Sequence, residues 1–162
     1  KKNLFLVDNL ELLHASAVEL YGNSILIKGE AGSGKSSLAI KLIALGAKLI
    51  ADDRTKLYKR GETIFATAPS SLPKVIEARG VGLLTPPICK SAPILTVVDL
   101  SRITNERIPD WQKQRIELLG ISLPIFFIGN VVDPSSVLFV MMKYGIVDPI
   151  TDVQFFSKLK SS

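Results

Sequence analysis

A glycine-rich segment near the start of the chain has the residue types that bind phosphate. It fits the pattern G-x-x-x-x-G-K-[ST], the Walker A motif, and it consists of Gly29, Glu30, Ala31, Gly32, Ser33, Gly34, Lys35 and Ser36. Glycine reaches positive φ angles at little steric cost, so successive backbone N–H groups can point together at an anion. Lys35 adds a full positive charge for the outer phosphates, and the small, hard hydroxyl of Ser36 suits Mg²⁺. These residues predict a phosphate-binding loop.

The segments on either side of this loop support the prediction. The run Ser24–Lys28 is apolar enough for a buried strand, and Ser37–Leu45 has the apolar spacing of a helix that ends before Gly46. A strand, a glycine loop and a helix N-terminus in this order are what an anion site at a helix end requires. The alternative is a glycine-rich turn that merely opens a helix.

Two adjacent carboxylates are the next candidates. Asp52 and Asp53 end the strand predicted over residues 47–51, which follows the helix after the loop. Strand–helix–strand connectivity places the two strand ends at one edge of the sheet, near the phosphates. Adjacent residues on a strand point to opposite faces, so we expect only one of the two at any one spot. One would position Mg²⁺ and the other would accept a proton; the alternative is a pair that caps a turn.

Four further side chains are candidates with weaker signals. His14 is the only histidine, and its ring could bond an active-site carboxylate or be structural. Glu77 and Arg79 could bind a metal ion and a phosphate, although spacing alone favours an ordinary helix end capped by Gly80. Asp99 ends an apolar strand, which is the Walker B pattern and a competing metal site.

The remaining sequence predicts an α/β domain with a mixed sheet, because hairpins alternate with strand–helix units. We expect strands, turns and helices at the following places: a strand over 15–20 with a turn at 21–23, a second hairpin over 55–60 and 63–68, a short helix over 70–79, a strand over 81–84, a strand over 93–100, a loop with a short helix over 102–114, a strand over 123–128, and a helix from 133 to about 144. The tail from about 146 would be a packed helix or a separate arm.

Length and composition describe an ordinary globular chain. Its 162 residues, 47% apolar and 22% charged, suit a single domain over 1–162. The single Cys89 excludes an internal disulfide framework, and no apolar run approaches the roughly 20 residues that span a bilayer, so we expect a cytoplasmic protein without a membrane partner. The net charge of +5 comes from scattered Lys and Arg residues, which disfavours a nucleic-acid partner.

Taken together, these segments resemble the catalytic domain of HPr kinase/phosphorylase, the bacterial serine kinase of the phosphocarrier protein HPr. The resemblance covers about residues 12–84 in order and spacing and rests on His14–Ser16, Gly29–Ser36, Leu49–Asp53 and Ile76–Gly82. The later run 117–124 resembles the short members of the family that contain only the kinase domain.

The resemblance implies a nucleotide-binding core like that of phosphoenolpyruvate (PEP) carboxykinase. It also implies an ATP- and Mg²⁺-dependent serine kinase whose partner is HPr or an HPr-like phosphocarrier, with the phosphorylase reaction as the reverse, in a homo-oligomer. Residues Gly29–Ser36 would bind the ATP phosphates, with Lys35 as a catalytic cation and Arg79 in support.

The same resemblance implies roles for the acidic residues. Ser36 and Glu77 would bind Mg²⁺, and Asp53 would support the metal region. Asp52 would take the proton from the target serine, with His14 hydrogen-bonded to it.

Two other functions stay open on the sequence. The chain could be a small-molecule kinase or P-loop NTPase that uses Asp99 as its Walker B ligand, or a non-catalytic sensor that binds nucleotide and then a partner. Separate substitution of Asp99 and Glu77 distinguishes the first of these from the serine kinase, and phosphate transfer to a protein distinguishes the second.

Overall fold

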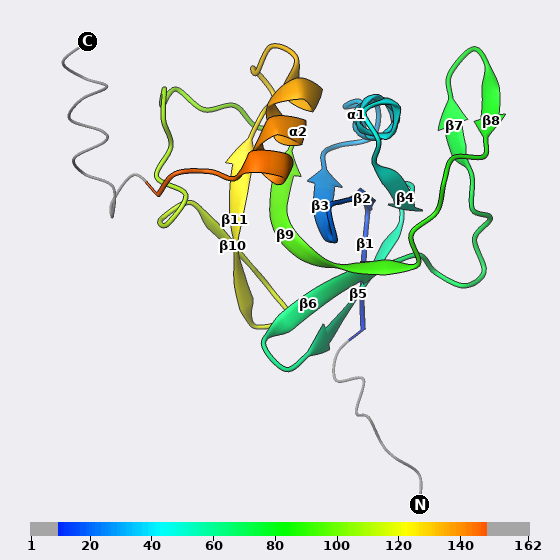
Figure 1. Cartoon of the computed structure of the whole chain (residues 1–162), viewed down its shortest axis with the longest axis horizontal. Coiled ribbons are helices and arrows are strands. Elements are labelled where there is room, and N and C mark those ends of the chain that lie inside the picture. Colours follow the sequence, from blue (N-terminus) through cyan, green and yellow to red (C-terminus); the bar gives the residue numbers. More distant parts are fainter. Residues whose placement is uncertain (1–9, 149–162) are drawn as a thin grey trace, which may run out of the picture.

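The computed structural model describes residues 10–148 of the chain, and Figure 1 shows their arrangement. The elements in chain order are β1 (Glu11–Leu13), β2 (Ala15–Leu20), β3 (Asn23–Lys28), α1 (Lys35–Ala44), β4 (Lys48–Ala51), β5 (Thr55–Arg60), β6 (Thr63–Thr67), β7 (Ile76–Ala78), β8 (Gly82–Leu84), β9 (Ser91–Asp99), β10 (Arg115–Leu118), β11 (Ile121–Phe127) and α2 (Pro134–Tyr144). Within this part of the chain, no helix is long and apolar enough to cross a membrane. Most of the predicted tail, residues 149–162, lies outside the described residues.

A nine-stranded mixed sheet carries the fold, with the strand order β1-β5-β6-β9-β3-β2-β4 and with β10 and β11 joined to it through β9. Strands β3 and β11 run parallel to β9, whereas the β2–β3, β2–β4 and β5–β6 pairs are antiparallel. The predicted mixed α/β fold is therefore confirmed. Because β3 and β4 both run antiparallel to β2, their carboxyl ends meet the start of β2 at one edge of the sheet.

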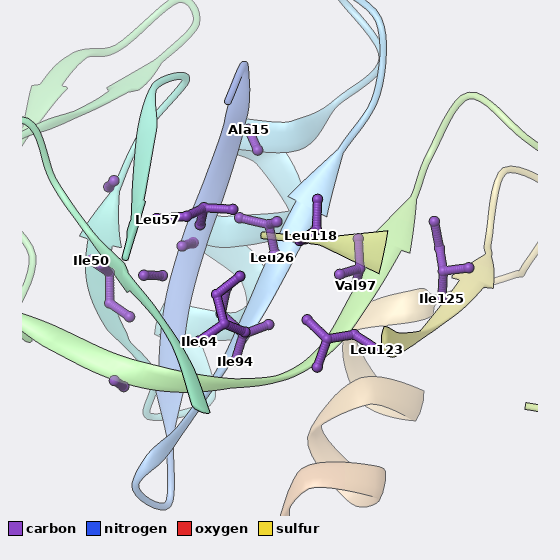
Figure 2. Packing of buried hydrophobic residues seen from close by; sticks show 14 residues of the cluster. Ala15, Leu26, Ile50, Leu57, Ile64, Ile94, Val97, Leu118, Leu123 and Ile125 are labelled. Atoms are coloured by element: carbon purple, nitrogen blue, oxygen red, sulfur yellow. The ribbon is translucent and has the colours of Figure 1, made fainter. Parts of the chain in front are cut away.

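Both faces of this sheet are buried. Alternate residues of β3 serve the two sides: Ile25 and Ile27 pack with α1 and α2, and Leu26 packs into the opposite cluster. Figure 1 shows both helices on the same side. On the other side the sheet curls over itself, and Figure 2 shows Leu57 and Ile64 gathered around Leu26. Buried apolar side chains of this size each contribute roughly 1.5–3 kcal/mol to stability. The two clusters therefore stabilise the strands β2, β3 and β4, whose ends position the glycine loop and the two aspartates.

Local turn chemistry explains the predicted hairpins. Tyr21 and Gly22 adopt φ angles of 53° and 84° between β2 and β3, as a two-residue hairpin turn requires. Gly61, with φ of 58°, turns β5 into β6. The strands predicted over 15–20, 24–28, 47–51, 55–60, 63–68, 93–100 and 123–128 and both longer helices are confirmed, with their ends shifted by at most about two residues.

The short helix predicted over residues 70–79 is wrong. Residues 76–84 form the β7–β8 hairpin instead, with Ile76 opposite Leu84, and it stands apart from the main sheet in Figure 1. Ser70 and Pro73 are residue types typical of a helix start, but the β-branched pair Val75 and Ile76 favours an extended chain. The expected helix within 102–114 is also absent from the described structure, which has turns there, and β1 and β10 were not predicted.

Candidate functional site

The phosphate loop leaves the end of β3 and enters α1 at Lys35, as predicted. Gly32 and Gly34 have φ angles of 80° and 102°, a left-handed conformation that side chains disfavour. Gly29 is required for a different reason, because a Cβ there would collide with Ser33 Oγ and lie 3.3 Å from Leu100 Cβ. In the described part of the chain, Ser33 Oγ is the buried side-chain polar atom without a hydrogen-bond partner. The Ser33 side chain therefore packs directly against the backbone of Gly29 inside the loop.

Lys35 lies inside this loop. Its side chain is only 6% exposed, and its Nζ donates hydrogen bonds of 2.9 Å to Gly29 O and 3.1 Å to Glu30 O. The ammonium group is therefore held inside the loop by two loop carbonyls. A buried cation without a carboxylate partner makes the loop a strong site for an anion.

Asp52 is held by two hydroxyl groups. Ser36 Oγ donates a hydrogen bond of 2.8 Å to Asp52 Oδ1, and Ser16 Oγ donates one of 2.9 Å to the same oxygen. Ser36 is in the phosphate loop and Ser16 is in β2, so the shared oxygen joins three segments at the sheet edge. The carboxylate is partly buried and is fixed against the first turn of α1.

Asp53 is held differently. Its backbone turns to φ of 65°, its N–H donates a 3.1 Å hydrogen bond to Ser16 Oγ, and its Oδ1 lies 3.3 Å from His14 Nδ1. Both side chains of this pair are more than half exposed, 59% for His14 and 56% for Asp53. The structure therefore pairs His14 with Asp53, whereas we had expected a hydrogen bond to Asp52.

These groups surround one cavity of about 740 Å³. Its lining includes both aspartates, His14, the hairpin residues Glu77, Ala78 and Arg79, and the loop residues Ala31, Gly32, Gly34, Lys35, Ser36 and Ser37. The expectation that only one carboxylate would reach this spot is wrong, because the left-handed turn at Asp53 interrupts the strand alternation. The hairpin that replaces the predicted helix supplies part of the cavity lining, so Glu77 and Arg79 reach the site from a β-hairpin and not from a helix.

The oxygen atoms at this cavity fit Mg²⁺ in kind. The described residues contain no cluster of three or more His, Cys, Asp or Glu side chains that could hold a metal ion alone. Mg²⁺, however, is usually bound by one or two carboxylates together with substrate phosphates and waters. The Ser36 hydroxyl and the carboxylates of Asp52 and Glu77 are hard donors around the same cavity, and they suit an ion that arrives with a nucleotide.

Asp99 takes a supporting position. It is 9% exposed, is not among the residues that line the cavity, and its Oδ1 accepts a 2.9 Å hydrogen bond from Ser101 N. Ser101 Oγ in turn accepts one of 2.7 Å from Glu30 N. These contacts connect the end of β9 to the phosphate loop and give no support to Asp99 as a direct metal ligand.

Sequence analysis missed the roles of Ser16 and Ser101. His14 is exposed and precedes β2, whereas Ser16 is buried within β2, so no alternation rule relates the two residues. Ser101 follows Asp99 in a loop, where no periodicity applies.

Comparisons with known proteins show the family of the part of the chain that forms this cavity. The family model described as HPr Serine kinase C-terminal domain matches residues 7–89, and every cavity-lining residue lies inside that range. HPr kinase/phosphorylase of Pediococcus pentosaceus is 43% identical over 84 residues, which cover 49% of this chain and 27% of the relative. The same enzyme of Limosilactobacillus reuteri (strain DSM 20016) is 44% identical over 73 residues, which cover 44% of this chain and 23% of the relative. The chain thus matches about a quarter of the length of these curated relatives.

The fold likeness extends further than the sequence likeness. The structure of the HPr(Ser) kinase/phosphatase from Coxiella burnetii aligns with a TM-score of 0.67 at 22% identity, and the alignment covers 81% of this chain and 93% of that one. This likeness shows that the chain shares the fold of that protein, and the PEP carboxykinase-like nucleotide-binding role of the core stays a prediction.

Proposed function

The chain belongs to the HPr serine kinase C-terminal domain family, and on that basis we propose that it transfers the γ-phosphoryl group of ATP to a serine of an HPr-like phosphocarrier protein. One observation carries this proposal: the Asp53–His14 pair opens into the same cavity as the phosphate loop. A nucleotide binder needs only the loop, whereas transfer to an alcohol also needs a group that can accept the proton of that alcohol.

The loop would bind the nucleotide phosphates. The loop amides and Lys35 Nζ, which now bonds to Gly29 O and Glu30 O, would bind the phosphate oxygens, together with Arg79, which lines the same cavity. Ser36, Asp52 and Glu77 would hold Mg²⁺, which neutralises phosphate charge when it is bound. Phosphoryl transfer depends mainly on such positioning and charge neutralisation.

The contacts support an exchange of the roles that we expected for the two carboxylates. Asp52 Oδ1 already accepts two hydroxyl hydrogen bonds, one of them from Ser36, which suits the metal side of the site. Asp53 is more exposed, is paired with His14 and lines the cavity. We therefore assign the proton-accepting role to Asp53, with His14 orienting its carboxylate.

The reaction balances with these groups. The serine oxygen forms a bond to the γ-phosphorus, the bond from that phosphorus to the β,γ-bridging oxygen breaks, and ADP leaves. Asp53 takes the serine proton. The relatives are also named for a phosphorylase activity. For this chain, the corresponding step would form a bond from inorganic phosphate to the phosphoserine phosphorus and break the bond from that phosphorus to the serine oxygen, so that pyrophosphate leaves and Asp53 returns the proton to the serine oxygen.

Incubation with γ-labelled ATP and an HPr-type phosphocarrier, followed by mass-spectrometric mapping, tests the proposal. We expect one labelled phosphoserine, and we expect its label to be lost when excess inorganic phosphate is added. ATP binding without phosphoserine would indicate the nucleotide sensor, and ATP turnover without protein labelling would indicate the small-molecule kinase or NTPase. The homo-oligomer stays a prediction that light scattering of the same sample tests.

A further inference from the structure

Ser16 bonds to both aspartates of the site although it is not among the residues that line the cavity. Its side chain is 0% exposed. Its Oγ donates a 2.9 Å hydrogen bond to Asp52 Oδ1 and accepts one of 3.1 Å from Asp53 N. Because a serine hydroxyl has a single proton and an amide N–H can only donate, the two hydrogen bonds have fixed directions. One buried hydroxyl thus links the side chain of one aspartate to the backbone of the next.

The bond to Asp53 explains how two adjacent carboxylates reach one cavity. Asp52 and Asp53 follow the end of β4, and both line the same cavity. The chain achieves this through the left-handed backbone of Asp53, at φ of 65°, a conformation that is uncommon outside glycine but that aspartate adopts more readily than most residues. The Arg54 N–H donates a 2.7 Å hydrogen bond to Asp52 O across this turn. The Asp53 N–H is held by Ser16 Oγ, and the Asp53 carboxylate then lies 3.3 Å from His14.

The bond to Asp52 fixes the other carboxylate. Ser16 and Ser36 approach the same oxygen, Oδ1, from β2 and from the phosphate loop. This arrangement sets the orientation of the Asp52 carboxylate relative to Ser36.

We propose that Ser16 is a positioning residue, whose hydroxyl holds Asp53 against His14 and Asp52 against Ser36. Its effect on phosphoryl transfer rests on the proposed function, but its effect on the two carboxylates does not. A merely structural serine would contribute to stability and leave the Asp53–His14 contact unchanged.

The chain offers a reporter and a matched control. His14 is the only histidine, so its imidazole resonances are assigned without ambiguity by NMR. Ser24 is also a fully buried strand serine, but its Oγ lies 3.1 Å from Pro93 O and 3.3 Å from Ala92 O, away from the site, and its single proton is directed at these two carbonyls. The experiment records the His14 resonances at one pH in the wild type, Ser16→Ala, Ser24→Ala and Asp53→Asn.

We expect the His14 resonances of Ser16→Ala to move in the same direction as those of Asp53→Asn and by at least roughly half as much, while those of Ser24→Ala stay at wild-type positions. Wild-type His14 resonances in a folded Ser16→Ala variant would overturn the proposal. If Ser16→Ala does not fold, Ser16→Cys carries the same expectation, since the thiol keeps the size of the side chain and is only a weak donor.

Kinase assays separate the two proposals. If the wild type phosphorylates the phosphocarrier, Ser16→Ala should lower kcat by roughly 10- to 100-fold while the KM for ATP changes by less than about twofold. If the wild type shows no transfer, the proposed function fails, and the His14 resonances still decide the role of Ser16.

Discussion

His14 Nδ1 lies 3.3 Å from Asp53 Oδ1, at the mouth of the cavity that contains the phosphate loop. Asp52, one residue earlier, is bonded to Ser36 and Ser16 instead. The two neighbouring carboxylates therefore have different partners. We expect substitutions of Asp52 and Ser36 to affect Mg²⁺ binding, and substitution of Asp53 to affect proton transfer.

Ser36→Ala should separate the metal side of the site from the proton-accepting side. The substitution removes the hydroxyl that donates to Asp52 Oδ1 but leaves the His14–Asp53 pair intact. We expect the Mg²⁺ concentration for half-maximal transfer to rise roughly 10-fold or more, as expected for the loss of a hydrogen bond to a charged group. Titration of activity with Mg²⁺ at saturating ATP measures this, and Ser24→Ala, a buried strand serine that does not line the cavity, is the control. An unchanged Mg²⁺ requirement would argue against Ser36 as a metal ligand.

Lys35→Met should weaken ATP binding by roughly 10- to 100-fold, because it removes a cation that forms charge-assisted hydrogen bonds. Methionine keeps the length of the side chain, and Lys41→Met on the exposed side of α1 is the matched control. Isothermal titration with a non-hydrolysable ATP analogue measures the affinity. Equal affinity in Lys35→Met and wild type would contradict the assigned role of the loop.

Gly29→Ala should weaken ATP binding for a steric reason. Its new Cβ would collide with Ser33 Oγ, and overpacking of this kind costs roughly 1–3 kcal/mol, which displaces the loop. The double variant Gly29→Ala/Ser33→Ala removes the colliding hydroxyl, and we expect it to recover part of the affinity in the same titration. If the double variant binds no better than the single one, the collision is not the cause.

Asp99→Asn should leave the rate of phosphoryl transfer close to that of the wild type. The amide oxygen of asparagine still accepts the hydrogen bond from Ser101 N, and Asp99 is not among the cavity-lining residues. Ser101→Ala removes the acceptor for Glu30 N and should weaken ATP binding only about fivefold, as for one neutral hydrogen bond. Loss of Mg²⁺-dependent turnover in Asp99→Asn, with turnover retained in Glu77→Gln, would favour the Walker B alternative instead.

Asp133 should make the start of α2 sensitive to acid. Hydrogen bonds from the side chains of Ser136 and then Ser135 lower the pKa of Asp133 below its ordinary value of 3.8. A carboxylate with a lowered pKa in the folded state contributes stability that is present above the unfolded pKa and is lost as pH falls through the folded pKa. We expect the unfolding free energy of the wild type to fall more steeply below about pH 3.8 than that of Asp133→Asn. Urea titrations between pH 2.5 and 6 measure this, and parallel pH profiles of the two proteins would contradict it.

Much of the site was predictable because its residues follow local rules. The phosphate loop was readable from glycine and lysine spacing, and Asp52 and Asp53 from the strand that precedes them. The pairing of His14 with Asp53 was not predictable, because it depends on one left-handed residue, Asp53, whose φ of 65° is held by a serine 37 positions earlier. Sequence patterns predict the regular alternation of side chains along a strand, whereas this site depends on the positive φ of Asp53 after the strand has ended.

Most of the fold was also predictable from local rules, and the prediction failed at the β7–β8 hairpin. Apolar alternation and Gly turns gave the hairpins β2–β3 and β5–β6. The β7–β8 hairpin was mistaken for a helix because Ser70 and Pro73 provide helix-start signals, whereas burial of Ile76 beside α1 decides the outcome. Local signals of this strength are overridden by tertiary packing.

The comparison of Asp53→Asn with Asp52→Asn tests the central claim most directly. Phosphoserine formation and ATP affinity are measured for both variants with an HPr-type phosphocarrier over a range of Mg²⁺ concentrations up to saturation. We predict that Asp53→Asn lowers kcat by roughly 10²- to 10⁴-fold, the range for loss of a general base, with ATP affinity retained, and that Asp52→Asn chiefly raises the Mg²⁺ requirement. Wild-type turnover in Asp53→Asn, with turnover abolished in Asp52→Asn at every Mg²⁺ concentration, would contradict it.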